Sequence, residues 1–162
     1  MSRPEGFRKG VCGIFLSENG KILMGERLKD KGQWQLPQGG IEKGESPLQA
    51  LRREMEEEVG VTKIKVLRKT ENWISYLWPE GLFPKARHLG QEHLYYVIDG
   101  SHLQPETFPE TEEFARFKWF TVPEALAAVV DWKRPNYEEA FKLLDLLSPS
   151  ANEPRPLQSK SE

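Results

Sequence analysis

Three glutamates at helical spacing are the residues whose types and positions best suit chemistry. Glu54, Glu57 and Glu58 lie at positions i, i+3 and i+4, so a helix would place all three carboxylates on one face. Carboxylate oxygens suit Mg²⁺ or Mn²⁺, hard cations that bind through a few carboxylates together with the phosphates of a substrate. A glutamate-rich helix face is more often only a solvated surface, so the run alone leaves both interpretations open.

The residues around this run favour a cation site. Arg53 precedes Glu57 by one turn and could orient it, and Glu45 lies just ahead of the expected helix. Gly39 and Gly40 open a loop whose backbone can approach a ligand closely, because neither residue has a side chain. The combination is much rarer than a glutamate-rich run alone.

The helix that positions the glutamates has marked ends. Ser46 and Gln49 match a capping box, and Pro47 occupies the first helical position. Gly60 suits a left-handed cap at the end of the helix. Apolar residues recur at three- and four-residue steps and predict a packing stripe made of Leu48, Leu51, Met55 and Val59.

The other elements follow from alternation, helical periodicity and turn residues. Asn19 and Gly20 predict the turn of a hairpin. We expect an irregular stretch between residues 72 and 93, a loop over 100–113 and a disordered tail over 148–162. The expected strands are 11–17, 21–26, 33–38, 63–72, 93–99 and 115–121, and the further helices are 122–130 and 137–147.

Composition limits the class of protein. The chain has 162 residues and a net charge of −2, which predicts one globular domain over 1–147 without the basic footprint of a protein that wraps nucleic acid. No apolar run reaches the roughly 18 residues of a membrane span and the first residues do not resemble a signal peptide, so we expect a cytoplasmic protein. The single cysteine, Cys12, is expected to be a small buried residue, and the three histidines to be surface or packing residues.

The segment GGIEKGESPLQALRREMEEEVGV resembles the signature box of the Nudix hydrolases. That resemblance implies an α/β fold, an α/β/α sandwich with a mixed central sheet, in which the loop and helix of the box hold metal ions. It also implies hydrolysis of a diphosphate linked to another group, usually a nucleoside. The specified positions of the box are Gly39, Glu45, Arg53, Glu54, Met55, Glu57, Glu58, Gly60 and Val61.

The resemblance also assigns roles. It implies Glu54, Glu57 and Glu58 as ligands of Mg²⁺ or Mn²⁺, with the backbone carbonyl of Gly39 as a further ligand. Arg53 and Glu45 would orient helix and loop, and Gly60 would support the end of the box. We take Glu113, in the acidic segment PETEEFARF, as an additional ligand or the base, although an exposed loop glutamate is an equal alternative. The expected catalytic set is therefore Arg53, Glu57, Glu58 and Glu113.

Segments outside the box are similar to one Nudix branch, that of RNA 5′-pyrophosphohydrolases and dinucleoside polyphosphate hydrolases. The branch implies that Arg8, Trp132 and Lys133 lie near the nucleotide end of the substrate. Gln38 could contact phosphate or base, or could merely stabilise the turn. Arginine can fork onto phosphate oxygens, tryptophan can stack on a base and lysine can hold a phosphate, although solvation or packing would also explain each residue. The resembling segments are Gly6–Arg8, Trp34–Gly40, Asn72–Trp73, Gly90–Gln91, Glu113–Phe114, Trp119 and Val130–Arg134.

The chain departs from that branch in one strand. It has Gly90-Gln91-Glu92-His93-Leu94-Tyr95-Tyr96 where the branch usually has Gly-Gln-x-Gln-Lys-Trp-Phe. Our leading hypothesis is a Mg²⁺-dependent RNA 5′-pyrophosphohydrolase that starts mRNA decay, acting on a 5′-triphosphorylated RNA end. The alternatives are a dinucleoside polyphosphate hydrolase and a non-catalytic nucleotide-binding regulator. No specific protein partner and no membrane partner is indicated.

Overall fold

A mixed eight-stranded sheet forms the centre of the computed structural model, which describes residues 6–81 and 87–147. Its longest strands, β1 and β7, run parallel over ten residue pairs, while β1 is antiparallel to β2 and β4. The strands are β1 (Phe7–Leu16), β2 (Ile22–Arg27), β3 (Trp34–Gln35), β4 (Gln38–Gly40), β5 (Val66–Lys69), β6 (Ile74–Leu77), β7 (Gly90–Asp99) and β8 (Phe114–Phe120).

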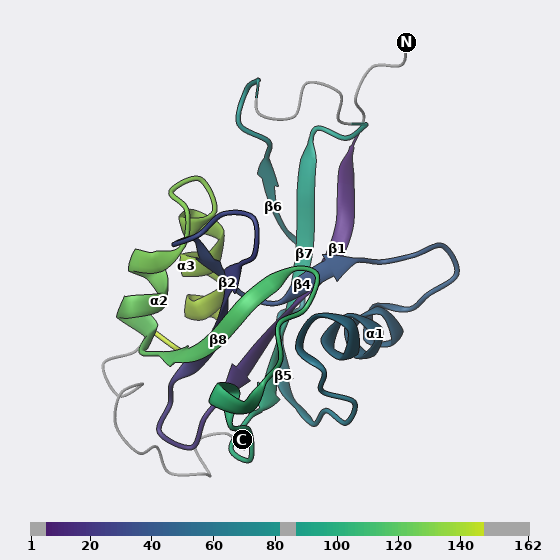
Figure 1. The fold of residues 1–162 in the computed structure, drawn as a ribbon. Helices are drawn as coiled ribbons and strands as arrows, with labels where there is room; N and C mark the ends of the chain where they lie inside the picture. Colours follow the sequence, from purple (N-terminus) through teal and green to yellow (C-terminus); the bar gives the residue numbers. More distant parts are fainter. Residues whose placement is uncertain (1–5, 82–86, 148–162) are drawn as a thin grey trace.

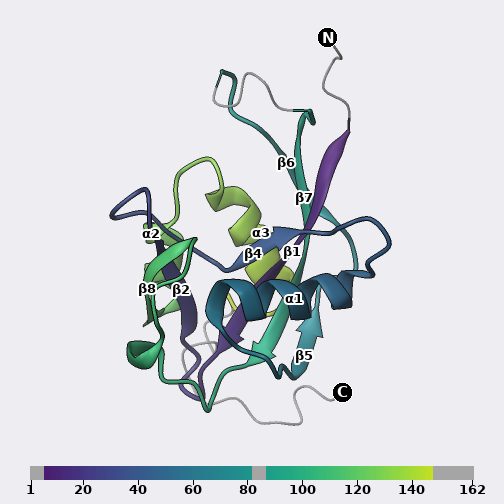
Figure 2. The ribbon, with the colours of Figure 1, turned by 45° about the vertical axis from the view of Figure 1, so that its right-hand side comes forward.

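Helices cover both faces of the sheet (Figures 1 and 2). Helix α1 (Pro47–Val59) lies on one face, and α2 (Val122–Ala128) and α3 (Arg134–Leu143) lie on the other. A short 3₁₀ turn, η1 (Pro105–Thr107), interrupts the expected loop before β8. The architecture is therefore the expected α/β/α sandwich with a mixed central sheet.

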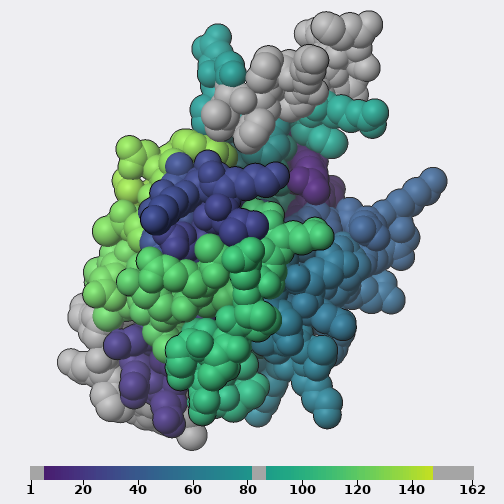
Figure 3. Space-filling model, viewed as in Figure 1, coloured from purple at the N-terminus to yellow at the C-terminus, as the bar shows by residue number. Residues whose placement is uncertain are grey.

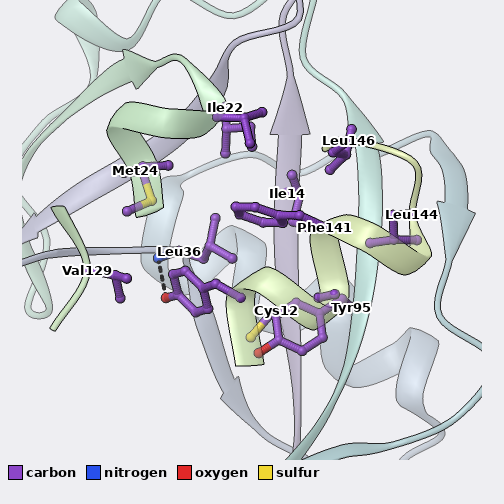
Figure 4. Close-up of a cluster of buried hydrophobic side chains, with 14 of the residues drawn as sticks. Cys12, Ile14, Ile22, Met24, Leu36, Tyr95, Val129, Phe141, Leu144 and Leu146 are labelled. Carbon is purple, nitrogen blue, oxygen red and sulfur yellow. Dashed lines mark hydrogen bonds between the residues drawn. The ribbon is translucent and has the colours of Figure 1, made fainter. Parts of the chain in front are cut away.

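Alternate residues of β1 supply two hydrophobic cores, because successive side chains of a strand point to opposite faces. Cys12 and Ile14 belong to the core beneath α2 and α3, whereas Val11 and Phe15 belong to the core beneath α1. Figure 4 shows the first core, where the Leu36 backbone N–H donates to the Tyr137 hydroxyl at 3.0 Å. Cys12 is buried, as expected.

The capping residues of α1 behave as predicted. Ser46 Oγ accepts from the Gln49 N–H, Gln49 Oε1 accepts from the Ser46 N–H, and Gly60 adopts a φ of 83°. The predicted stripe is wrong in one member, because Leu48 is 40% exposed while Ala50 is buried. Leu48 lies seven residues before Met55 and so on the same side of the helix, but in its first turn, where the core no longer reaches.

Several predicted boundaries need correction. Residues 74–77 were expected to be irregular but form β6, and β7 starts at Gly90 rather than at 93. The strand expected over 63–72 shrinks to β5, the one expected over 33–38 divides into β3 and β4, and the helices end at 128 and 143. Helix α3 begins at Arg134, three residues early, with proline in its first turn. Pairing with β7, the next strand along the chain, decided β6, and the local pattern of four residues does not encode that pairing.

Two further expectations concern the ends of the chain and membranes. The tail expected over 148–162 lies outside the described residues. None of the helices that the structure describes is both long enough and apolar enough to cross a membrane.

Candidate active site

The three glutamates of α1 differ in burial. Glu54 is 8% exposed and its carboxyl group lies against the backbone of Gly39, whereas Glu58 is half-buried and Glu57 is exposed. A Cβ atom at Gly39 would overlap the Glu54 carboxyl group. The absence of a side chain at Gly39 is therefore what lets the Glu54 carboxylate meet the middle of β4.

Arg53 ties the loop before α1 to the helix. Its Nε and Nη2 bind the two carboxylate oxygens of Glu45 at 2.7 and 2.9 Å, and Nη2 also donates to the Gly40 carbonyl at 2.9 Å. Nη1 lies 2.9 Å from Glu54 and 3.4 Å from Glu57. The guanidinium lowers the pKa of Glu45 to about 2. The loop fixed in this way projects from the body of the protein (Figures 1 and 3).

Replacing Arg53 with lysine is expected to lower kcat/KM by about 10- to 100-fold, the range typical when the support of a metal ligand is lost. Lysine keeps the charge, but a single ammonium group cannot bind Glu45, Glu54 and the Gly40 carbonyl at once. Steady-state kinetics and urea unfolding check this result. Activity within threefold of the parent protein would show that the positive charge is sufficient and that the several N–H donors of the guanidinium are not needed.

Glu113 comes close to α1 although it lies far along the chain. Burial raises the pKa of Glu58 to about 8, and the next largest cause is the charge of Glu113, followed by that of Glu54. Glu58 Oε1 also accepts a long hydrogen bond of 3.5 Å from the Gln38 backbone N–H. Glu113 itself pairs with Arg27 at 3.2 Å. The structure therefore brings the four glutamates of the sequence analysis into one electrostatic neighbourhood.

The donor set of this neighbourhood suits a hard divalent cation. All the groups that could bind one are oxygens, from the glutamates and from the carbonyl of Gly39. Burial and, after it, the negative charges of the neighbouring glutamates raise the Glu58 pKa, and a cation would relieve that repulsion. No three acidic, histidine or cysteine side chains in residues 6–81 and 87–147 are gathered as ready-made ligands of one ion. Arg53 and the Gln38 backbone engage these carboxylates instead.

A partly buried chain of polar contacts, which the sequence analysis missed, links Glu113 to Lys133. Arg27 Nη1 binds Glu113 and lies 3.4 Å from Gln35 Oε1, to which Lys133 Nζ donates at 2.9 Å. Burial lowers the pKa of Lys133. The contacts of Arg27 and Gln35 span up to 98 residues, so no local signal marked either residue.

Trp132 and Arg8 lie on the side of the sheet that faces α3. The Trp132 ring meets Tyr76 edge-on at 5.3 Å and Trp78 at 6.4 Å, and Lys133 Nζ lies 5.3 Å from its centroid. A Cβ at Gly40 would lie 2.6 Å from Arg8 Nη2, so the Arg8 guanidinium rests on the backbone of β4. The four substrate-binding residues expected from sequence thus lie on neighbouring strands and at the start of α3.

His93 is a further residue of interest that the sequence analysis did not select for a functional role. It is 3% exposed, its Nε2 is 3.1 Å from Gln38 Oε1, and its ring packs edge-on against Tyr76 and Tyr95. The alternation of Gln91, His93 and Tyr95 along β7 was an available signal, because alternate residues of a strand share a face.

Burial, with the charges of Lys133 and Arg8, lowers the pKa of His93 to about 3. A histidine whose folded pKa is depressed stays neutral in the folded protein, so the unfolded chain binds the extra proton between pH 3 and about 6.5. Relative to His93→Gln, the free energy of unfolding should therefore fall with acidification by about 1.4 kcal/mol per pH unit in that window. Urea unfolding of both proteins from pH 4 to 8 measures the difference, and parallel curves would contradict it.

Comparison with known proteins places this site in a family. Residues 6–143 match the model described as NUDIX domain. The RNA pyrophosphohydrolase of Acidiphilium cryptum (strain JF-5) is 36% identical over 145 residues, which cover 82% of this chain and 86% of that protein. Nudix hydrolase 25 of Arabidopsis thaliana is 33% identical over 151 residues, 86% of each chain.

A solved structure agrees at the level of the fold. The E. coli dihydroneopterin triphosphate pyrophosphohydrolase has a TM-score of 0.68 to this chain at 20% identity, covering 87% of this chain and 99% of that one. The family match spans the glutamates of α1, the loop that Arg53 holds and the strands beneath them. The chain therefore belongs to the Nudix hydrolase family.

Proposed function

We propose that this chain is a Mg²⁺-dependent RNA 5′-pyrophosphohydrolase, which converts a 5′-triphosphate or diphosphate end of RNA to a monophosphate. The observation that carries the proposal is the position of Gln38. Its backbone N–H meets Glu58 and its side chain meets His93, so the carboxylates of α1 adjoin the side of the sheet with Arg8, Trp132 and Lys133. Several relatives that are 32–36% identical and bear the name RNA pyrophosphohydrolase support the same substrate class.

In this proposal one group of residues, in α1 and the loop before it, binds the metal ion, and a second group binds the substrate. Glu54, Glu57, Glu58 and the Gly39 carbonyl hold Mg²⁺, with Mn²⁺ as the alternative. The bound cation supplies neutralisation of phosphate charge. Arg53 and Glu45 hold the loop before α1 in a fixed position relative to the helix. A carboxylate takes the proton of the attacking water, and Glu58 and Glu113 are the two candidates by position. Arg8 and Lys133 hold phosphates, and Trp132 stacks on the first base.

One comparison of substrates tests the proposal. We would measure kcat/KM in Mg²⁺ for a short 5′-triphosphorylated RNA and for diadenosine tetraphosphate, with Glu57→Gln as the control for contaminating activity. A strong RNA preference supports the proposal and a cytoplasmic role at the start of mRNA decay. A strong dinucleotide preference overturns it in favour of dinucleoside polyphosphate hydrolysis. If the parent protein turns over neither substrate faster than Glu57→Gln does, the result would favour a nucleotide-binding regulator.

Replacing Trp132 with alanine is expected to raise KM about 10-fold while kcat stays within about threefold, because a stacked base is worth about 1–3 kcal/mol of binding. Trp132→Phe is the matched variant, since it keeps a ring for stacking and for the edge contact with Tyr76. An unchanged KM in Trp132→Ala, together with a lower melting temperature, would show that Trp132 only packs.

A further inference from the structure

Within the described part of the chain, His93 has one hydrogen-bonding partner and one nitrogen without a partner, although it is almost completely buried. Nε2 lies 3.1 Å from Gln38 Oε1, and Nδ1 has no partner among the residues that the structure describes. Gly10 lies on β1, between β7 and β4 in the sheet, opposite His93 of β7 and opposite Gly40, which follows Gln38 by two residues in β4. A Cβ at Gly10 would lie 2.9 Å from His93 Cδ2, so the missing side chain lets the imidazole reach across β1 to Gln38.

The unpartnered nitrogen identifies the tautomer. A neutral imidazole has one N–H and one lone pair, and burial among Tyr76, Tyr95 and Gln38 favours the neutral form. A proton on Nδ1 would leave a buried donor without an acceptor, which proteins rarely tolerate, whereas a proton on Nε2 leaves only a lone pair unpaired. The imidazole therefore donates through Nε2 to the Gln38 carbonyl oxygen.

This donation determines how Gln38 is oriented. The carboxamide is planar, so an oxygen held by His93 directs the amide NH₂ away from the imidazole. Gln38 then presents its N–H donors to a ligand, and such donors suit the oxygens of a phosphate. Without such a partner, a glutamine side chain can present either its oxygen or its NH₂ group to a ligand. The sequence alone did not decide between a contact with phosphate and a contact with base.

We propose that His93 is a positioning residue which, as the Nε2–H tautomer, holds Gln38 with its amide NH₂ directed at the polyphosphate of the substrate. The inference rests on the proposed function, because it assigns a contact within the same site. His93 occupies the place of a glutamine in the branch pattern, and a glutamine there could also donate an N–H to the Gln38 oxygen. His93→Gln should therefore preserve the orientation of Gln38, whereas His93→Phe should not, because phenylalanine has no N–H to donate.

The first test reads the tautomer directly. ¹⁵N NMR of the histidine-labelled full chain at pH 7 should show the His93 proton on Nε2, with the signal assigned by its loss in His93→Gln and the exposed His102 as the reference. A proton on Nδ1, or on both nitrogens, would overturn the proposal. This readout is independent of which substrate the enzyme turns over.

The second test uses inorganic tripolyphosphate as the probe, which has no base or ribose. Its Kd in Mg²⁺ should rise about 10-fold in His93→Phe and in Gln38→Met, and the double variant should bind no worse than Gln38→Met alone. His93→Gln should bind within about threefold of the parent protein. Additive losses, or equal losses in His93→Phe and His93→Gln, would overturn the proposal by showing a packing role. Normal probe binding with no turnover of RNA would instead refute the proposed function and leave the positioning role intact.

Discussion

Gly39→Ala is expected to remove at least 99% of the activity while the protein still folds. The added methyl group would overlap the carboxyl group of Glu54, which is the flexible end of a side chain and can move away. Gly39 has no positive φ, so alanine strains no backbone there. The displaced carboxylate loses its place in the cation site, and errors of about 1 Å at such a site cost on the order of 100-fold in rate.

Gly40→Ala is the matched control for that result. Its methyl group would meet Arg8 Nη2 at 2.6 Å instead of Glu54. We therefore expect the Gly39 variant to lose kcat and the Mg²⁺ response, and the Gly40 variant to lose mainly substrate affinity, seen in KM. Circular dichroism and thermal unfolding establish that both proteins fold. Equal kinetic defects in the two variants would show that the loop as a whole, and not the carboxylate, is disturbed.

Glu57→Gln is expected to lower kcat/KM by about 100- to 1,000-fold, comparable with the loss of one preorganised electrostatic group. The exchange keeps the shape of the side chain but removes the charge that would bind Mg²⁺. Glu57 is exposed, and among the residues that the structure describes its one ion pair is a 3.4 Å contact to Arg53. The free energy of unfolding should therefore change by less than about 0.5 kcal/mol.

Glu56→Gln provides the control within the same helix. Glu56 is exposed and lies outside the spacing that groups Glu54, Glu57 and Glu58. Its exchange makes the same change in net charge, and activity should stay within about twofold of the parent protein. If both variants lose activity to the same extent, net charge rather than a cation ligand explains the loss, and our assignment of Glu57 is wrong.

Elements with local signals were predictable from sequence. Helix α1 begins and ends where its capping residues indicated, and the turn at Asn19 and Gly20 joins β1 to β2. The early start of α3 also had a local signal, because Pro135 in the first turn marks a helix start. Strand β6 had none, since four residues acquire strand geometry through pairing with β7.

The residues of the candidate site also differ in whether a local sequence signal marked them. Carboxylate spacing and the glycines indicated an oxygen-rich cation site, because a helical repeat converts sequence spacing directly into a shared face. His93, Gln35 and Arg27 escaped notice, since their importance lies in partners that are distant in the chain. The Leu48 prediction failed for a related reason, because periodicity defines the side of a helix but not how far the core extends along it.

Local sequence thus determined the glutamate helix, its ends and the type of chemistry that its side chains support. Tertiary structure alone decided which groups meet those glutamates. The charge of Glu113 acts on Glu58, and Lys133 reaches Gln35 across 98 residues of sequence. The physical reason is that helix periodicity and caps act over a few residues, whereas strand pairing and sheet order join segments whose local patterns do not specify their partners.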